Sequence, residues 1–90
     1  MRIDWTEHAE MRLLEWSRLK NITRAEVEAN VEKPDQIVKG HEGLQVAQSA
    51  RGEGLLRIPF AEAEGGRKIV TLYWTSQVAR YWEEPDANSI

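Results

Sequence analysis

Eight side chains of this 90-residue sequence transfer protons or bind anions in other proteins, and they fall in three stretches. In the first, His8 precedes Arg12 by one helical turn, which sets an imidazole that exchanges protons near neutral pH beside a cation. The second is Arg57, a charge inside the apolar run LLRIPF, which must face water or a partner. The third is the polar and basic end of the stretch IVTLYWTSQVARYW, with Thr71, Tyr73, Thr75, Arg80 and Tyr81. Together they suit acid–base chemistry at a phosphate-like anion, provided that the fold brings the three stretches together.

The first two stretches also have purely structural interpretations. An imidazole in the first turn of a helix, such as that of His8, often bonds only to nearby backbone or water. Arg12 can pair with Glu15 on the surface, an arrangement that contributes little to stability. Arg57 can lie on a strand face that is open to water.

The third stretch and the second histidine have structural interpretations as well. Thr71 and Tyr73 are typical strand residues, and Arg80 and Tyr81 can clamp the end of the chain over the core. His41 lies in the turn GHEG with no second ligand at metal-binding spacing, so a surface turn is the preferred interpretation. We expect neither a metal nor another cofactor.

The composition limits the class of protein. The net charge is −3, and because nucleic-acid-binding proteins usually carry a basic surplus, this balance argues mildly against a nucleic-acid partner without excluding one. The absence of cysteine excludes disulfides, thiolate metal sites and thiol nucleophiles. The start MRIDWTEHAE does not resemble a signal peptide and no apolar run is long enough to span a membrane, so the predicted location is the cytoplasm.

The N-terminal part predicts two helices. Apolar residues at helical spacing predict the first over about residues 6–20, and Asn21 breaks the run. The second opens at ITRAEV, which reads as a capping box in which Thr23 caps the helix and Glu26 reaches back to it. Pro34 ends this helix, because its ring disfavours a helical residue before it.

Strands fill the rest of the chain. Alternating apolar residues and turn signals predict strands within 35–40, 43–50, 55–63 and 67–75. Pro59 lacks a donor and predicts an edge position or a bulge, whereas residues 67–75 carry bulk on both faces and are predicted to be central.

The predicted fold class is therefore α+β. Two N-terminal helices pack on one face of a three- to four-stranded, mainly antiparallel sheet, and the other face is left open for a site. The predicted organisation is a single domain over 1–83 and a flexible acidic tail over 84–90.

Two groups of motifs resemble a known family. TEHAEMR followed by ITRAEVEANVEKPDQI resembles the opening of a family of small prokaryotic domains of unknown function, family forty-two fifty-eight in that series. LLRIPFAEAEGGRKIVTLYWTSQVARYW resembles that family's strand with an arginine, acidic hairpin and Arg-Tyr-Trp ending. The family is similar to the RelE/ParE-like toxins in predicted fold, two helices laid on an antiparallel sheet.

The resemblance implies a toxin-type ribonuclease that needs no metal and is held in check by a cognate antitoxin protein. RNA cleavage needs a base for the 2′-hydroxyl, a cation for the developing charge and an acid for the leaving oxygen. The residues assigned to catalysis are His8, Arg57, Arg80 and Tyr81. Those assigned to substrate binding are Arg12, Thr71, Tyr73 and Thr75. The alternatives are a non-catalytic protein-binding module of the same fold and a degenerate member that keeps only the scaffold.

Overall fold

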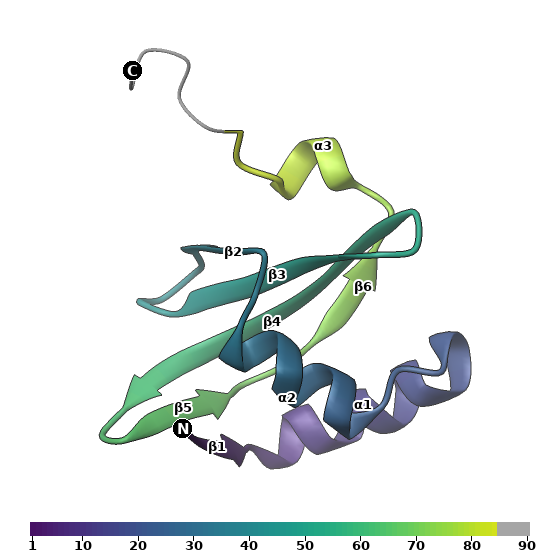
Figure 1. Ribbon diagram of the computed structural model, residues 1–90. Helices are drawn as coiled ribbons and strands as arrows, with labels where there is room; N and C mark the ends of the chain where they lie inside the picture. The colour runs from purple at the N-terminus through teal and green to yellow at the C-terminus, as the bar shows by residue number, and fades with distance from the viewer. Residues whose placement is uncertain (85–90) are drawn as a thin grey trace.

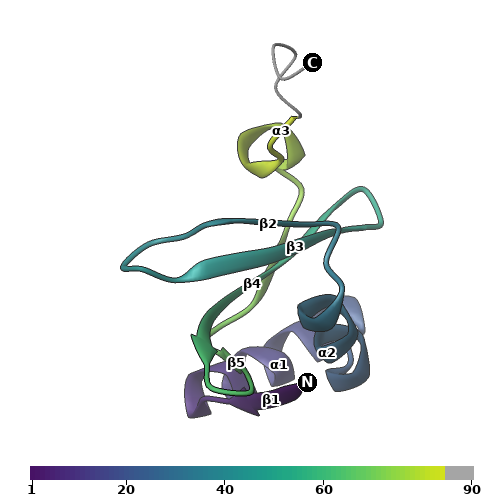
Figure 2. The ribbon, with the colours of Figure 1, turned by 60° about the vertical axis from the view of Figure 1, so that its left-hand side comes forward.

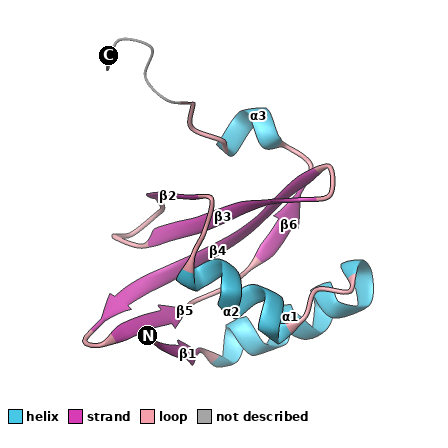
Figure 3. Ribbon diagram, in the orientation of Figure 1, coloured by secondary structure: helices cyan, strands magenta, loops and turns pink. Residues whose placement is uncertain are grey.

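The computed structural model describes residues 1–84 and shows a strand, two helices, five further strands and a short final helix (Figures 1 and 3). Their bounds are β1 Arg2–Trp5, α1 Glu7–Lys20, α2 Arg24–Glu32, β2 Gln36–Lys39, β3 Gln45–Arg51, β4 Gly54–Ala63, β5 Gly66–Ile69, β6 Tyr73–Thr75 and α3 Val78–Tyr81. The α+β prediction is confirmed. Apart from Glu84, the predicted tail lies outside the described residues.

The six strands form one open sheet in the order β1-β5-β4-β3-β2, with β6 beside β4. The longest strand, β4, pairs with β3 on one side and with β5 and β6 on the other. The predicted count of three or four strands is wrong. β1 is an additional strand, and it pairs with β5 in the parallel sense, so the sheet is mixed.

Pro59 explains a second difference from the prediction. The stretch 67–75 is not one central strand but two short strands, and the central strand is β4. The carbonyl of Pro59 accepts a hydrogen bond from Val70 N at 2.9 Å. The N–H and C=O of one extended residue point to the same neighbouring strand. The side of Pro59 that lacks an N–H therefore also faces Val70 and the stretch that contains it. The neighbouring stretch therefore breaks between β5 and β6 at this point. The predicted edge position of Pro59 is wrong, but the alternative, a bulge, agrees with the register, because two residues of β4 between Arg57 and Phe60 face three residues between Ile69 and Tyr73.

Both long helices begin and end where their local sequence predicts. Thr6 caps α1 by accepting from Ala9 N at 3.0 Å, and Asn21 ends it in the left-handed conformation (φ 57°). Thr23 caps α2 by accepting from Glu26 N at 3.1 Å. The Glu26 side chain does not reach back as predicted, because it forms an ion pair across to the sheet instead.

The helices α1 and α2 cover one face of the sheet, and α3 lies on the opposite side, as the two views show together (Figures 1 and 2). The core between the helices and the sheet is fully buried, and its members are Ala9, Ile22, Val27, Val31, Ala47, Leu56, Ile58, Phe60, Ile69 and Leu72. Alternate residues of β4 therefore point to the other face, and Arg57 is one of them. No helix among residues 1–84 is long and apolar enough to cross a membrane.

Candidate functional site

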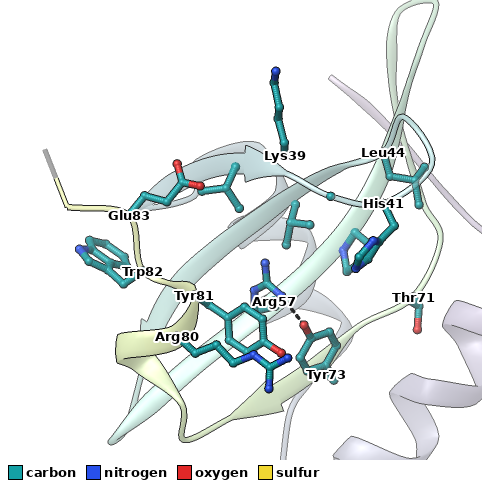
Figure 4. A pocket seen from close by; sticks show the side chains of 14 residues that line it. Lys39, His41, Leu44, Arg57, Thr71, Tyr73, Arg80, Tyr81, Trp82 and Glu83 are labelled. Atoms are coloured by element: carbon teal, nitrogen blue, oxygen red, sulfur yellow. Dashed lines mark hydrogen bonds between the residues drawn. The ribbon is translucent and has the colours of Figure 1, made fainter. Parts of the chain in front are cut away.

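The sheet face opposite the long helices carries a pocket of about 550 Å³, here named the Arg57 pocket (Figure 4). Its floor includes Val46, Arg57 and Pro59 of β3 and β4. One wall is the turn between β2 and β3, and the opposite wall is the end of the chain from Arg80 to Glu83. The open face that the sequence predicted is thus only partly open, because the C-terminal segment covers one side of it.

Arg57 lies at the centre of this floor and is only 8% exposed. Its Nε donates to Gln48 Oε1 at 2.8 Å, and its Nη1 donates to the hydroxyl of Tyr73 (Figure 4). The guanidinium carbon lies 3.9 Å from the centre of the Tyr81 ring. Within residues 1–84, no salt bridge includes Arg57.

A buried cation of this kind is costly unless something compensates it. Arginine does not lose its proton in proteins, so the charge stays in place. The partners that hold Arg57 are an amide, a phenol and aromatic ring faces, and all of them are neutral. The five N–H donors of a guanidinium also exceed the two acceptors supplied here. The geometry therefore leaves positive charge and unused donors, which are what an anionic ligand needs.

Tyr73 contributes a protonated hydroxyl to the same pocket. Burial raises its pKa above the ordinary value near 10, and this outweighs the opposing effect of the Arg57 charge. Its ring meets that of Tyr81 edge to face, with centres 6.4 Å apart. The Tyr73 oxygen accepts from Arg57, and the neighbouring Tyr81 side chain adds to the rise in the Tyr73 pKa.

Three further side chains that contain basic nitrogen stand at the rim of the pocket, with one acid among them, Glu83. His41 comes from the β2–β3 turn and points toward the pocket, on the side of Thr71 and Tyr73 (Figure 4). Lys39 also borders the pocket, but its ammonium group points away from Arg57 (Figure 4). The Arg80 guanidinium carbon lies 5.3 Å from the centre of the Tyr81 ring.

Two buried or half-buried amides hold the C-terminal wall in place. Gln48, which is fully buried, donates from Nε2 to the carbonyl of Tyr81 at 2.9 Å and to Gln36 Oε1 at 2.5 Å. Gln36 bonds to both the N–H and the C=O of Glu83, at 2.9 and 3.0 Å. The backbone after α3 is therefore fixed to β2 by Gln36 and to β3 by Gln48, and Gln48 also bonds to Arg57 of the pocket floor.

The structure brings together part of the set that the sequence predicted. The predicted site residues that line the pocket are Arg57, Thr71, Tyr73, Arg80 and Tyr81.

Three predicted site residues lie elsewhere. His8 is exposed on α1, in the helix layer on the other side of the sheet, so the expected convergence of His8 and Arg57 is wrong. Arg12 forms a surface ion pair with Glu15 at 2.7 Å. Thr75 pairs with Leu55 across β6 and β4, outside the pocket lining.

Sequence reasoning missed three members of the site. His41 was assigned to a surface turn, and although it is exposed, it lines the pocket. Gln48 gave no signal of its own, but it stands directly opposite Arg57 in the β3–β4 register. Trp82 was not among the predicted site residues but lines the pocket, whereas the other three tryptophans pack against the core.

Metal binding has no support in the described part of the chain, where no three histidine or carboxylate side chains are grouped as ligands. No family model, curated protein or solved structure matches the chain. The case for a function therefore depends on the Arg57 pocket itself.

Proposed function

We propose that the Arg57 pocket binds a phosphate of RNA and that the protein cleaves RNA without a metal, as a toxin-type ribonuclease related to the RelE/ParE-like group. The observation that carries this proposal is the Arg57 guanidinium, which is 8% exposed and held only by neutral partners. A phosphate would complete its hydrogen bonds and balance its charge.

The pocket also holds groups suited to the proton transfers. In the proposed reaction His41 removes the proton of a ribose 2′-hydroxyl, and the 2′-oxygen bonds to the adjacent phosphorus. Arg57 stabilises the extra negative charge on the phosphorane. Tyr73 donates its proton as the bond from phosphorus to the 5′-oxygen breaks. The products are a 2′,3′-cyclic phosphate and a 5′-hydroxyl, and both side chains then recover their original protonation through water.

A cognate antitoxin is the proposed partner. An inhibitor of this site must cover the mouth of the pocket, between the β2–β3 turn and α3. A helix or an added strand could do so by binding across the sheet face or along the edge of β2, which ends the sheet on that side.

The alternative is a non-catalytic protein-binding module. One observation favours it: His41 is exposed on a turn, and no hydrogen bond among the described residues orients its ring. A carboxylate of an acidic peptide would meet Arg57 as well as a phosphate would.

The decisive experiment incubates the purified chain with end-labelled single-stranded RNA in the presence of a chelator. We expect fragments that end in a 2′,3′-cyclic phosphate. His41→Ala should lower the rate by about 100-fold or more, whereas His8→Ala, the matched change on the opposite side of the sheet, should leave it unchanged. Intact RNA with the wild-type chain, together with tight binding of an acidic peptide, would reject cleavage in favour of the binding module.

A further inference from the structure

Gln48 is the residue that links the centre of the Arg57 pocket to its C-terminal wall. It is 0% exposed, and its amide makes three hydrogen bonds. Through Oε1 it accepts from Arg57, and through Nε2 it donates to the Tyr81 carbonyl. The Tyr81 ring in turn lies on the Arg57 guanidinium. Arg57 of the floor, Gln48 and Tyr81 of the wall thus each interact with the other two.

The side chain that holds the Arg57 guanidinium at position 48 is a neutral amide and not a carboxylate. Buried guanidinium groups are commonly paired with a carboxylate, which holds them in place and also cancels their charge. A glutamate differs from glutamine by one group and could accept the same Nε–H. The amide at position 48 gives Arg57 the same hydrogen bond without the negative charge.

We infer that Gln48 is a positioning residue that fixes the Arg57 guanidinium while leaving its positive charge available to the phosphate of the ligand. It also ties the wall that carries Tyr81 to the same guanidinium, so the shape of the pocket and the orientation of its cation depend on one amide. This inference rests on the proposed phosphate site, and it adds that the charge of the site is set at position 48.

The test compares Gln48→Glu with Gln48→Met. Both variants lack the amide N–H that binds the Tyr81 carbonyl, so both loosen the wall, and only the first introduces a negative charge beside Arg57. Gln36→Glu is the charge control. It places the same negative charge in the same hydrogen-bond network, but Gln48 lies between this charge and the Arg57 guanidinium. The probe is single-stranded RNA with 2′-O-methyl groups, which binds but cannot be cleaved by attack of the 2′-oxygen.

We expect Gln48→Glu to bind this RNA at least about tenfold more weakly than Gln48→Met, because the phosphate then meets a neutralised pair. The slope of log affinity against log salt should fall by about 0.7, the value for one phosphate of a single strand that is no longer neutralised by the protein. Gln48→Met should weaken binding only about 2- to 10-fold and keep the slope. Gln36→Glu should keep the wild-type salt slope as well.

A second measurement reports the positioning role without any ligand. The Nε–H of Arg57 should exchange slowly with water in the wild type and in Gln48→Glu, and quickly in Gln48→Met, as nuclear magnetic resonance can show. A purely structural role for Gln48 would lower the melting midpoint of both variants without separating their salt slopes.

The outcomes distinguish this inference from the proposed function. Equal affinity and equal salt slope for Gln48→Glu and Gln48→Met would overturn the inference, even if the wild type cleaves RNA. Binding of the modified RNA with the expected separation of slopes, but no cleavage of normal RNA, would support the inference and overturn the proposed reaction. No binding of RNA or of inorganic phosphate by the wild type would overturn both.

Discussion

Replacing Arg57 by methionine should separate function from stability more clearly than any other single change. The variant keeps an unbranched side chain of similar width but removes the charge and its donors. If Arg57 binds a phosphate, removal of a charge-assisted hydrogen bond should cost about 1.5–3 kcal/mol of binding free energy, or about 10- to 150-fold in affinity.

The effect on stability should be small because two large terms oppose each other. The variant no longer makes the hydrogen bonds to Gln48 and Tyr73 or the interaction with the Tyr81 ring, together about 4–7 kcal/mol. It also no longer buries an ion without a counter-charge, which costs several kcal/mol in the wild type. We therefore expect the free energy of unfolding to change by about 2 kcal/mol or less in either direction.

The assay measures binding of labelled 2′-O-methyl RNA by fluorescence anisotropy, and stability by denaturant unfolding followed through tryptophan emission. Arg67→Met is the matched control. Arg67 is also largely buried, but it donates to the Val31 carbonyl at 2.6 Å and pairs with Glu62 outside the pocket. Arg67→Met should lower stability and leave RNA binding intact. The reasoning is refuted if Arg57→Met loses more than about 3 kcal/mol of stability and still binds RNA as the wild type does.

Two further predictions concern ionisation and packing. Because burial raises the pKa of Tyr73 above about 10, the unfolded chain loses this proton first, so its contribution to stability is complete below about pH 10 and is lost as the pH rises further. The unfolding free energy of the wild type should therefore fall more steeply in alkali than that of Tyr73→Phe, and equal slopes would contradict the assignment. Leu56→Ala, at a position with 0% exposure, should cost about 2–5 kcal/mol in denaturant unfolding. Leu14→Ala, at 65% exposure, should stay within about 0.5 kcal/mol, and similar losses at both positions would contradict the described core.

Local signals in the sequence predicted the helices and most strands. The cap at Thr23 and the stop at Asn21 involve residues within a few positions of each other, so they can be read directly. β1 could not be read in this way, because its pairing partner β5 lies more than sixty residues later and the parallel register leaves no turn between them. The alternation of Ile3 and Trp5 was its only local sign.

The sequence predicted those site residues that stand out within a single stretch of the chain. Arg57 stands out as a charge among apolar residues, and the polar ending after β6 stands out in the same way. His8 was misplaced because helical spacing determines its neighbours on α1 but not the side of the sheet on which α1 packs. Gln48 was missed because its importance arises only from the register that sets it opposite Arg57.

The position of Arg57 in the fold is itself an argument for function. A domain of this size has one small core, and it gains little stability from a cation buried on the other face of its central strand. The flanking residues Leu56 and Ile58 face the core, so their strand packs against the helices without any need for a charge between them. The neighbours of Arg57 are nevertheless arranged to keep it both ordered and charged. An amide, a phenol with a raised pKa and an aromatic ring achieve this together, and a partner that brings negative charge accounts for the arrangement better than stability does.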